Sequence, residues 1–314
     1  LSASAVRDSL NQAQAVFLAP RSGEDEGVKR HISAAVIGTR GGVGASTLVT
    51  SLAWIFSVDQ RMPTALLDLD VHFGTGALAL DLEPGRGLTD AIDNPGRIDG
   101  LFIERAMIRA NENLAILSAE APISQPLMTD GAAFLQLQEE FKHQFEMTVV
   151  DMPRNMMINF PHLLNDVNVV VLATEMSLAS ARDTIRILSW LKTHAPQAQP
   201  LIVANKVQPG VAEISKADFE ASIERKIDVT IPFDQKASKN SREAAGNAAK
   251  LGKTFVDANA GAKATSAIKQ LSSRIIGMGD EEAEKAAEAG AKKSLLGGLD
   301  FKNLLAKKKD PRTA

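Results

Sequence analysis

The organisation of this chain follows from one loop, Thr39-Arg-Gly-Gly-Val-Gly-Ala-Ser-Thr47, which lies between an apolar run and a helical pattern that starts at Leu48. Three glycines allow successive backbone N–H groups to turn toward one point, and the N-terminal end of the new helix adds positive potential there. The Ser46 hydroxyl lies where a phosphate-binding loop places its Mg²⁺ ligand. The sequence therefore predicts a nucleotide site.

One position departs from the usual phosphate-binding loop. Ala45 stands where a lysine ordinarily reaches the β- and γ-phosphates, so the motif is weaker than a full match. A glycine-rich turn that binds nothing is one alternative, although a turn alone needs a single glycine. A dinucleotide-binding fold is the other, because Gly42-x-Gly44 is followed by Asp68 and by a second glycine pair, Gly74-Thr-Gly76.

Short apolar runs alternate with helical patterns along the chain. The clearest helical spacing predicts one shared face for Leu178, Ala181, Ile185, Leu188 and Leu191. Seven runs are candidate strands: Ile32–Gly38, Ala65–Leu69, Leu114–Leu117, Met147–Val150, Val169–Ala173, Leu201–Ala204 and Val229–Ile231. This alternation predicts an α/β fold, with a mostly parallel sheet of seven or eight strands and helices on both faces.

Carboxylates follow two of these runs. The second run continues as Leu66-Leu-Asp-Leu-Asp70, and a two-residue period places Asp68 and Asp70 on the same side of the strand's carboxyl end. Asp151 ends the fourth run in Thr148-Val-Val-Asp-Met-Pro153. Because parallel sheets hold ligands at this edge, three carboxylates beside Ser46 favour Mg-nucleotide over recognition of a ribose.

The composition excludes several classes of protein. With 314 residues, 45% apolar and 23% charged, the chain is neither disordered nor fibrous. A net charge of −3 provides no general attraction for nucleic acid, so we do not expect DNA as a partner, and any DNA binding would have to be local. The absence of cysteine excludes disulfides and thiolate zinc sites. The apolar runs are shorter than the ~20 residues of a membrane-spanning helix.

Composition also divides the chain into three parts. Residues 1–30 combine an alanine-rich stretch with a polar linker, 31–279 form the folded domain, and 280–314 form a charged, partly disordered tail. The first residue, Leu1, leads us to expect an upstream domain. In the tail, Phe301, Leu304 and Leu305 share one face among lysines. This pattern favours a frayed polar terminus over weak membrane contact.

Beyond these features, the sequence resembles the P-loop ATPases of the ParA and MinD group, whose deviant Walker A loop reads Lys-Gly-Gly-x-Gly-Lys-Ser/Thr. Within the group it most resembles the CpaE/TadZ pilus assembly proteins. The resemblance covers roughly residues 31 to 276. Five segments carry it: Arg40–Thr47, Leu67–Gly74, Val149–Arg154, Asn205-Lys206 and Ile231–Asp234.

The resemblance implies a role for each matching residue. Ser46 would bind Mg²⁺ together with Asp70 and Asp151, the Walker B acid, while Asp68 and Asp70 would position the attacking water. Asn205 would contact adenine and Pro232 would line the base. The phosphates would lie against the loop residues Gly41, Gly42, Val43, Gly44, Ala45, Ser46 and Thr47.

Arg40 stands where the group has a lysine that reaches across a nucleotide-bridged homodimer. Arginine contacts phosphate in a different geometry from lysine, and Ala45 carries no charge, so we expect ATP hydrolysis to be slow or absent. Losing such a cation costs about 10³-fold or more in rate. ATP would then act mainly by stabilising one conformational or dimeric state.

By resemblance alone, the expected function is localisation or assembly of a Flp (type IVb, tight adherence) pilus secretion system, with its machinery proteins as partners. The expected location is the cytoplasm, and a peripheral position at the inner membrane or cell pole is a further option. In this branch a receiver-like domain commonly precedes the ATPase domain, so residues 1–30 are either its end or a simple arm. The alternatives are a ParA-type DNA or cargo partition ATPase and a nucleotide-dependent oxidoreductase with a Rossmann-like start.

Overall fold

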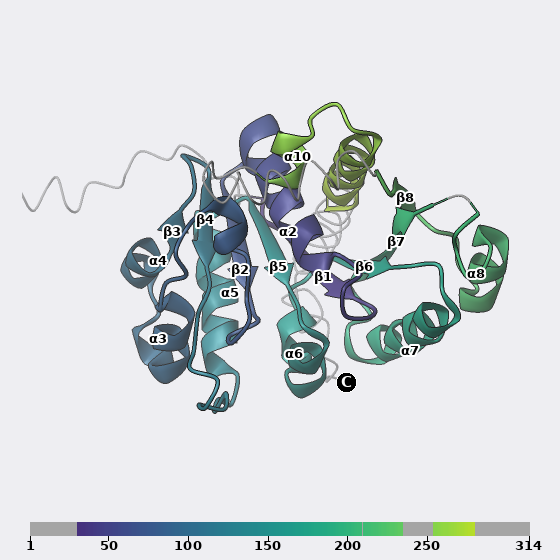
Figure 1. The fold of residues 1–314 in the computed structure, drawn as a ribbon. Coiled ribbons are helices and arrows are strands. Elements are labelled where there is room, and N and C mark those ends of the chain that lie inside the picture. The colour runs from purple at the N-terminus through teal and green to yellow at the C-terminus, as the bar shows by residue number, and fades with distance from the viewer. Residues whose placement is uncertain (1–29, 209, 235–253, 280–314) are drawn as a thin grey trace, which may run out of the picture. The chain divides into compact units, whose positions relative to one another are not determined.

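The computed structural model describes residues 30–208, 210–234 and 254–279, so the predictions for residues 1–29 and for the tail lie outside it. The described residues form one eight-stranded sheet, in the order β3-β4-β2-β5-β1-β6-β7-β8 (Figure 1). Neighbouring strands are parallel except for β3 and β4. The strands are β1 (Ile32–Gly38), β2 (Thr64–Asp68), β3 (Ile108–Arg109), β4 (Leu114–Leu117), β5 (Met147–Asp151), β6 (Val169–Thr174), β7 (Gln199–Val207) and β8 (Val229–Pro232).

Helices cover both faces of this sheet. The α-helices are α2 (Ala45–Trp54), α3 (Gly87–Asp93), α4 (Gly100–Ala106), α5 (Ala132–Gln144), α6 (Arg154–Asn159), α7 (Leu178–His194), α8 (Lys216–Ile223) and α10 (Phe255–Ala258), and residues 263–279 are also helical. Shorter turns are the π-helical η1 (Ile55–Asp59) and the 3₁₀ turns η2 (Leu78–Leu80), η3 (Pro95–Arg97) and η4 (Pro161–Leu164). The predicted fold class is therefore confirmed.

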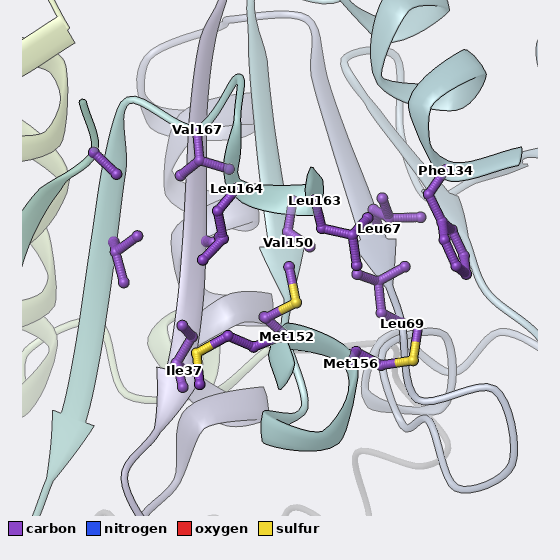
Figure 2. Packing of buried hydrophobic residues seen from close by; sticks show 14 of the residues in the cluster. Ile37, Leu67, Leu69, Phe134, Val150, Met152, Met156, Leu163, Leu164 and Val167 are labelled. Carbon is purple, nitrogen blue, oxygen red and sulfur yellow. The ribbon is translucent and has the colours of Figure 1, made fainter. Parts of the chain in front are cut away.

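Two apolar cores hold these layers together. On one face, the strands pack against α2, η1 and residues 263–279. On the other, they pack against helices that include α5, α6 and α7, and Figure 2 shows part of this core, where Leu163 lies beside Leu67 and Met156 beside Leu69. The central strands are apolar along their length because both of their faces are covered.

Strand register brings the predicted carboxylates to one edge. Asp68 at the end of β2 pairs with Asp151 at the end of β5, and Asp151 also pairs with Val36 of β1. β2 ends at Asp68, so Asp70 lies beyond the strand, whereas the sequence pattern had continued the strand to it. The phosphate-binding loop begins after β1 on the same edge.

The face expected for α7 is partly wrong. Leu178 and Ile185 are 62% and 43% exposed, whereas Thr184 and Ile187 are buried. A polar residue can take a core position here because the Thr184 hydroxyl donates a hydrogen bond to the Ser180 carbonyl at 2.7 Å. The spacing of apolar residues alone could not show that Thr184 is buried. The sequence patterns also omitted β3, which has only two residues.

No helix in the described part of the chain is both long and apolar enough to cross a membrane.

Candidate functional site

The loop between β1 and α2 has the left-handed backbone that a phosphate cradle requires. Gly42 has φ 80° and Gly44 has φ 89°, and Gly44 is the N-cap of α2. A Cβ on Gly44 would lie 2.6 Å from Asn205 Nδ2, so this position excludes a side chain for two independent reasons. Val43 packs into the core below the loop. The loop opens onto a cavity of about 1030 Å³ lined by residues 40–47.

From β7, two residues hold this loop. Asn205 Nδ2 donates a hydrogen bond to the Val43 carbonyl at 2.8 Å, and Asn205 Oδ1 accepts one from the Lys206 N–H at 2.9 Å. The Lys206 ammonium donates to the Gly42 carbonyl and lies 3.1 Å from Glu175 Oε1. Asn205 therefore braces the loop, and its predicted contact with adenine stays a prediction.

Two arginines lie along the other side of the loop. Arg154 Nη1 donates to the Thr39 carbonyl at 3.0 Å, and Arg154 lines the large cavity. Arg40 Nη1 lies 2.8 Å from Asp183 Oδ2 on α7 of its own chain. The Arg40 side chain is 49% exposed, whereas that of Asp183 is 15% exposed. Arg40 thus lines the cavity in an internal ion pair.

Opposite the loop, Asp151 forms the acidic wall of the cavity. It is 8% exposed and accepts a hydrogen bond from the Ser46 hydroxyl. Burial raises the pKa of Asp151 to about 7; the Ser46 hydrogen bond opposes this rise, and the charges of Asp68 and Asp70 add to it. Asp70 lines the same cavity. The structure therefore places Ser46, Asp70 and Asp151 on one cavity, and their binding of Mg²⁺ stays a prediction.

Asp68 faces its own loop. Its Oδ1 accepts a hydrogen bond from the Asp70 N–H at 3.1 Å, and its Oδ2 accepts one from the Gly76 N–H at 2.8 Å. Burial raises the pKa of this carboxyl, and the backbone hydrogen bonds oppose the rise. Cβ atoms on Gly74 and Gly76 would lie 2.6 Å and 3.0 Å from Asp68 Oδ2. The second glycine pair is thus explained by close packing on Asp68, without a dinucleotide.

These residues fit Mg²⁺ that arrives with phosphate. The described residues contain no group of three or more histidine or carboxylate side chains that could hold a metal ion. Mg²⁺ in nucleotide sites commonly keeps several waters and uses one or two protein ligands together with phosphate oxygens. The Ser46 hydroxyl on the Asp151 carboxylate, with Asp70 in the same cavity, supplies that set.

Beside the loop, a second cavity of about 290 Å³ has the character of a base pocket. It is lined mainly by apolar side chains, among them Leu48, Phe255 and Ile268, with Asn205 and Pro232 on its wall. Gly44, Thr47 and Lys206 line both cavities. The structure therefore places the predicted base contacts next to the predicted phosphate contacts.

Similar solved structures share this arrangement of elements. A ParA family ATPase from Chlorobium tepidum TLS matches with a TM-score of 0.67 and 16% identity over 78% of this chain and 98% of that chain. MinD in the MinC:MinD complex of Aquifex aeolicus matches with a TM-score of 0.63, 19% identity and coverage of 78% and 96%. MinD from Pyrococcus horikoshii OT3, solved with Mg-ADP, has a TM-score of 0.61, 16% identity and coverage of 78% and 96%. The fold is that of the ParA and MinD ATPases. No protein-family model and no curated protein matches the sequence.

Within the ParA/MinD fold, three residues contribute to the site without a role that the sequence predicts. Lys206 lies on the loop, Glu175 pairs with Lys206, and Asp183 pairs with Arg40. The sequence does carry a signal for Lys206, because it directly follows Asn205 at the carboxyl end of a strand, the edge of the sheet where the loop lies. The two acidic partners carry no sequence signal, because they come from elements distant along the chain.

Proposed function

We propose that this chain is a Mg-ATP-binding protein of the ParA/MinD type that forms a homodimer across its nucleotide. The pairing of the Ser46 hydroxyl with Asp151 beneath the amide-lined loop carries the proposal. An apolar pocket of suitable size adjoins it. The likeness to a MinD solved with Mg-ADP supports the choice of ligand.

We further propose that hydrolysis is slow or absent and that ATP acts as a conformational ligand. Ala45 places no charge at the γ-phosphate, and Arg40 is held by Asp183 of the same chain. For Arg40 to reach the nucleotide of a second copy, this ion pair must open. The ion pair is partly exposed, and such pairs contribute about 0 to 1 kcal/mol, so dimer formation can open it.

Calorimetry with Mg-ATP tests nucleotide binding. The wild type should bind, and Ser46→Ala should lose most of the Mg²⁺-dependent part of the affinity. Ser273→Ala, which alters an exposed serine on the 263–279 helix, is the matched control. Light scattering should show a dimer with ATP and a monomer without it. ATP turnover of about 1 s⁻¹ or faster would refute slow hydrolysis.

A role in localisation or assembly of a Flp pilus secretion system is the finer proposal, with the pilus machinery as partner. Leu67–Gly74 and Val149–Arg154 support it through their likeness to the CpaE/TadZ branch. Deleting the gene in its host should abolish these pili, and restoring it should bring them back. Normal pili in the deletion strain, or retention of the protein on DNA in a salt-dependent manner, would favour the partition alternative.

A further inference from the structure

The phosphate-binding loop lacks its own ammonium group, yet an ammonium group lies on it. We propose that Lys206, projecting from β7, supplies within one chain the positive charge for the nucleotide phosphates that Ala45 does not supply. This inference rests on the proposed nucleotide-binding function. It assigns the phosphate contact to a residue outside the loop motif.

The position of Lys206 fits a contact with the α- and β-phosphates. Lys206, Gly44 and Thr47 line both the cavity over the loop and the apolar base pocket. A nucleotide with its base in the pocket and its phosphates on the loop must pass this junction with its ribose and first phosphates. The ammonium of Lys206 already contacts the Gly42 carbonyl there.

The backbone of Lys206 is held in an unusual conformation. Its φ is 54°, in the left-handed region that residues with a Cβ rarely adopt. The Asn205 side chain secures it, because Asn205 Oδ1 accepts the Lys206 N–H while Asn205 Nδ2 donates to the Val43 carbonyl. Strained residues of this kind concentrate at ligand sites. The strand end is thus built to direct this side chain to the loop.

Glu175 neutralises Lys206 in the free protein. Its Oε1 lies 3.1 Å from the ammonium, and both side chains are close to half exposed. A lysine ammonium has three donors, so it can keep the Gly42 carbonyl and exchange Glu175 for a phosphate oxygen. Glu175 therefore competes with the nucleotide for the same cation.

The two arginines of the cavity suit a different part of the nucleotide. Arg40 and Arg154 line the large cavity but not the base pocket. Arg40 pairs with Asp183, and Arg154 donates to the Thr39 carbonyl at the start of the loop. They are placed for the outer phosphate or a second copy, which leaves the junction to Lys206.

Calorimetry with Mg-ATP, Mg-ADP and adenosine tests the proposal on Lys206→Met, which keeps the length of the side chain. ATP and ADP affinity should fall about 10- to 100-fold, the range for losing a hydrogen bond to a charged group, whereas adenosine affinity should stay the same. Ala45→Lys added to Lys206→Met should restore part of the loss. Lys226→Met, which breaks an exposed ion pair with Glu220 on α8, is the matched control and should bind as the wild type does.

Glu175→Gln gives an independent test on a partly exposed residue. It should tighten ATP binding, because the competing carboxylate is gone; unchanged or weaker binding would overturn the proposal. The proposal also fails if Lys206→Met binds ATP as the wild type does, or if it loses adenosine to the same degree, since a side chain that only braces the loop affects every ligand. In both cases the proposed function stands. A wild type that binds no ATP would overturn the proposed function and this inference together.

Discussion

Replacing Asp151 by asparagine should stabilise the free protein while weakening its response to Mg²⁺. The carboxyl is buried beside two other acids, and its pKa rises from 3.8 to about 7. Each pH unit between the folded and unfolded pKa values corresponds to about 1.4 kcal/mol, so ionising Asp151 in the folded state costs up to about 4 kcal/mol. Between these pKa values the folded protein keeps a proton that the unfolded chain has released. The contribution of Asp151 to stability therefore falls as pH rises through this window and is constant above it.

Urea denaturation without nucleotide measures this effect. The free energy of unfolding of Asp151→Asn relative to wild type should rise by up to about 4 kcal/mol between about pH 4 and pH 8. Asparagine does not titrate, so any constant packing effect cancels in this difference. Asp93→Asn, at an exposed site at the end of α3, is the control. Parallel pH profiles for Asp151→Asn and wild type would refute the reasoning, because they would show that the buried carboxylate pays no ionisation penalty.

Three further substitutions and one control substitution test the packing of the site and core. Gly44→Ala puts a Cβ 2.6 Å from an amide nitrogen at a positive φ, so unfolding free energy should drop by about 1 kcal/mol or more and ATP binding should weaken in calorimetry. In Gly74→Ala the new Cβ would lie 2.6 Å from the Asp68 carboxylate, so the free energy of unfolding in urea should fall by about 1–3 kcal/mol. Gly261→Ala, with open space around its Cβ, is the control and should be near neutral. Equal effects of the two substitutions would contradict the contact at Gly74. Phe134 is fully buried, so Phe134→Ala should lower the free energy of unfolding by about 3–5 kcal/mol. ATP affinity should stay unchanged, and an altered affinity would show that the core around Phe134 is coupled to the site.

The sheet was predictable because its central strands are buried on both faces. Ile32–Gly38 and Leu114–Leu117 have the same bounds in the sequence pattern and in the structure, since continuous apolar runs mark both ends of such strands. β3 was not predictable, because two residues carry no period. Strand β7, which lies between β6 and β8, extends through Gln199–Val207, beyond its apolar centre, since backbone pairing to these neighbours does not depend on side-chain polarity.

The candidate site was predictable where its residues belong to a sequence motif or end a strand. It was not predictable where the site depends on contacts between residues that are separated along the chain. Ser46 and Asp151 could be paired in advance, because a parallel sheet gathers strand ends and the loop at one edge. The direction of the Asp68 carboxylate could not be predicted, because it depends on a hydrogen bond from the backbone amide of Gly76, eight residues later. The ion pair of Arg40 with Asp183 joins residues far apart in sequence, and only the folded chain shows it.

The acidic edge of the sheet explains why metal and nucleotide should bind together. Strand register fixes Asp68 beside Asp151, so the free protein holds neighbouring carboxyl groups in a buried place and their pKa values rise. A bound Mg²⁺ would offset both the burial and the mutual repulsion of these carboxylates, but the described residues contain no group of three histidine or carboxylate side chains that could hold the ion by themselves. Phosphate oxygens of a bound nucleotide would complete the coordination, and they would in turn need the cation in order to approach Asp151 and Asp70. If the proposed function holds, the carboxylates that weaken the free fold are the same ones that would make Mg²⁺ and nucleotide mutually dependent ligands.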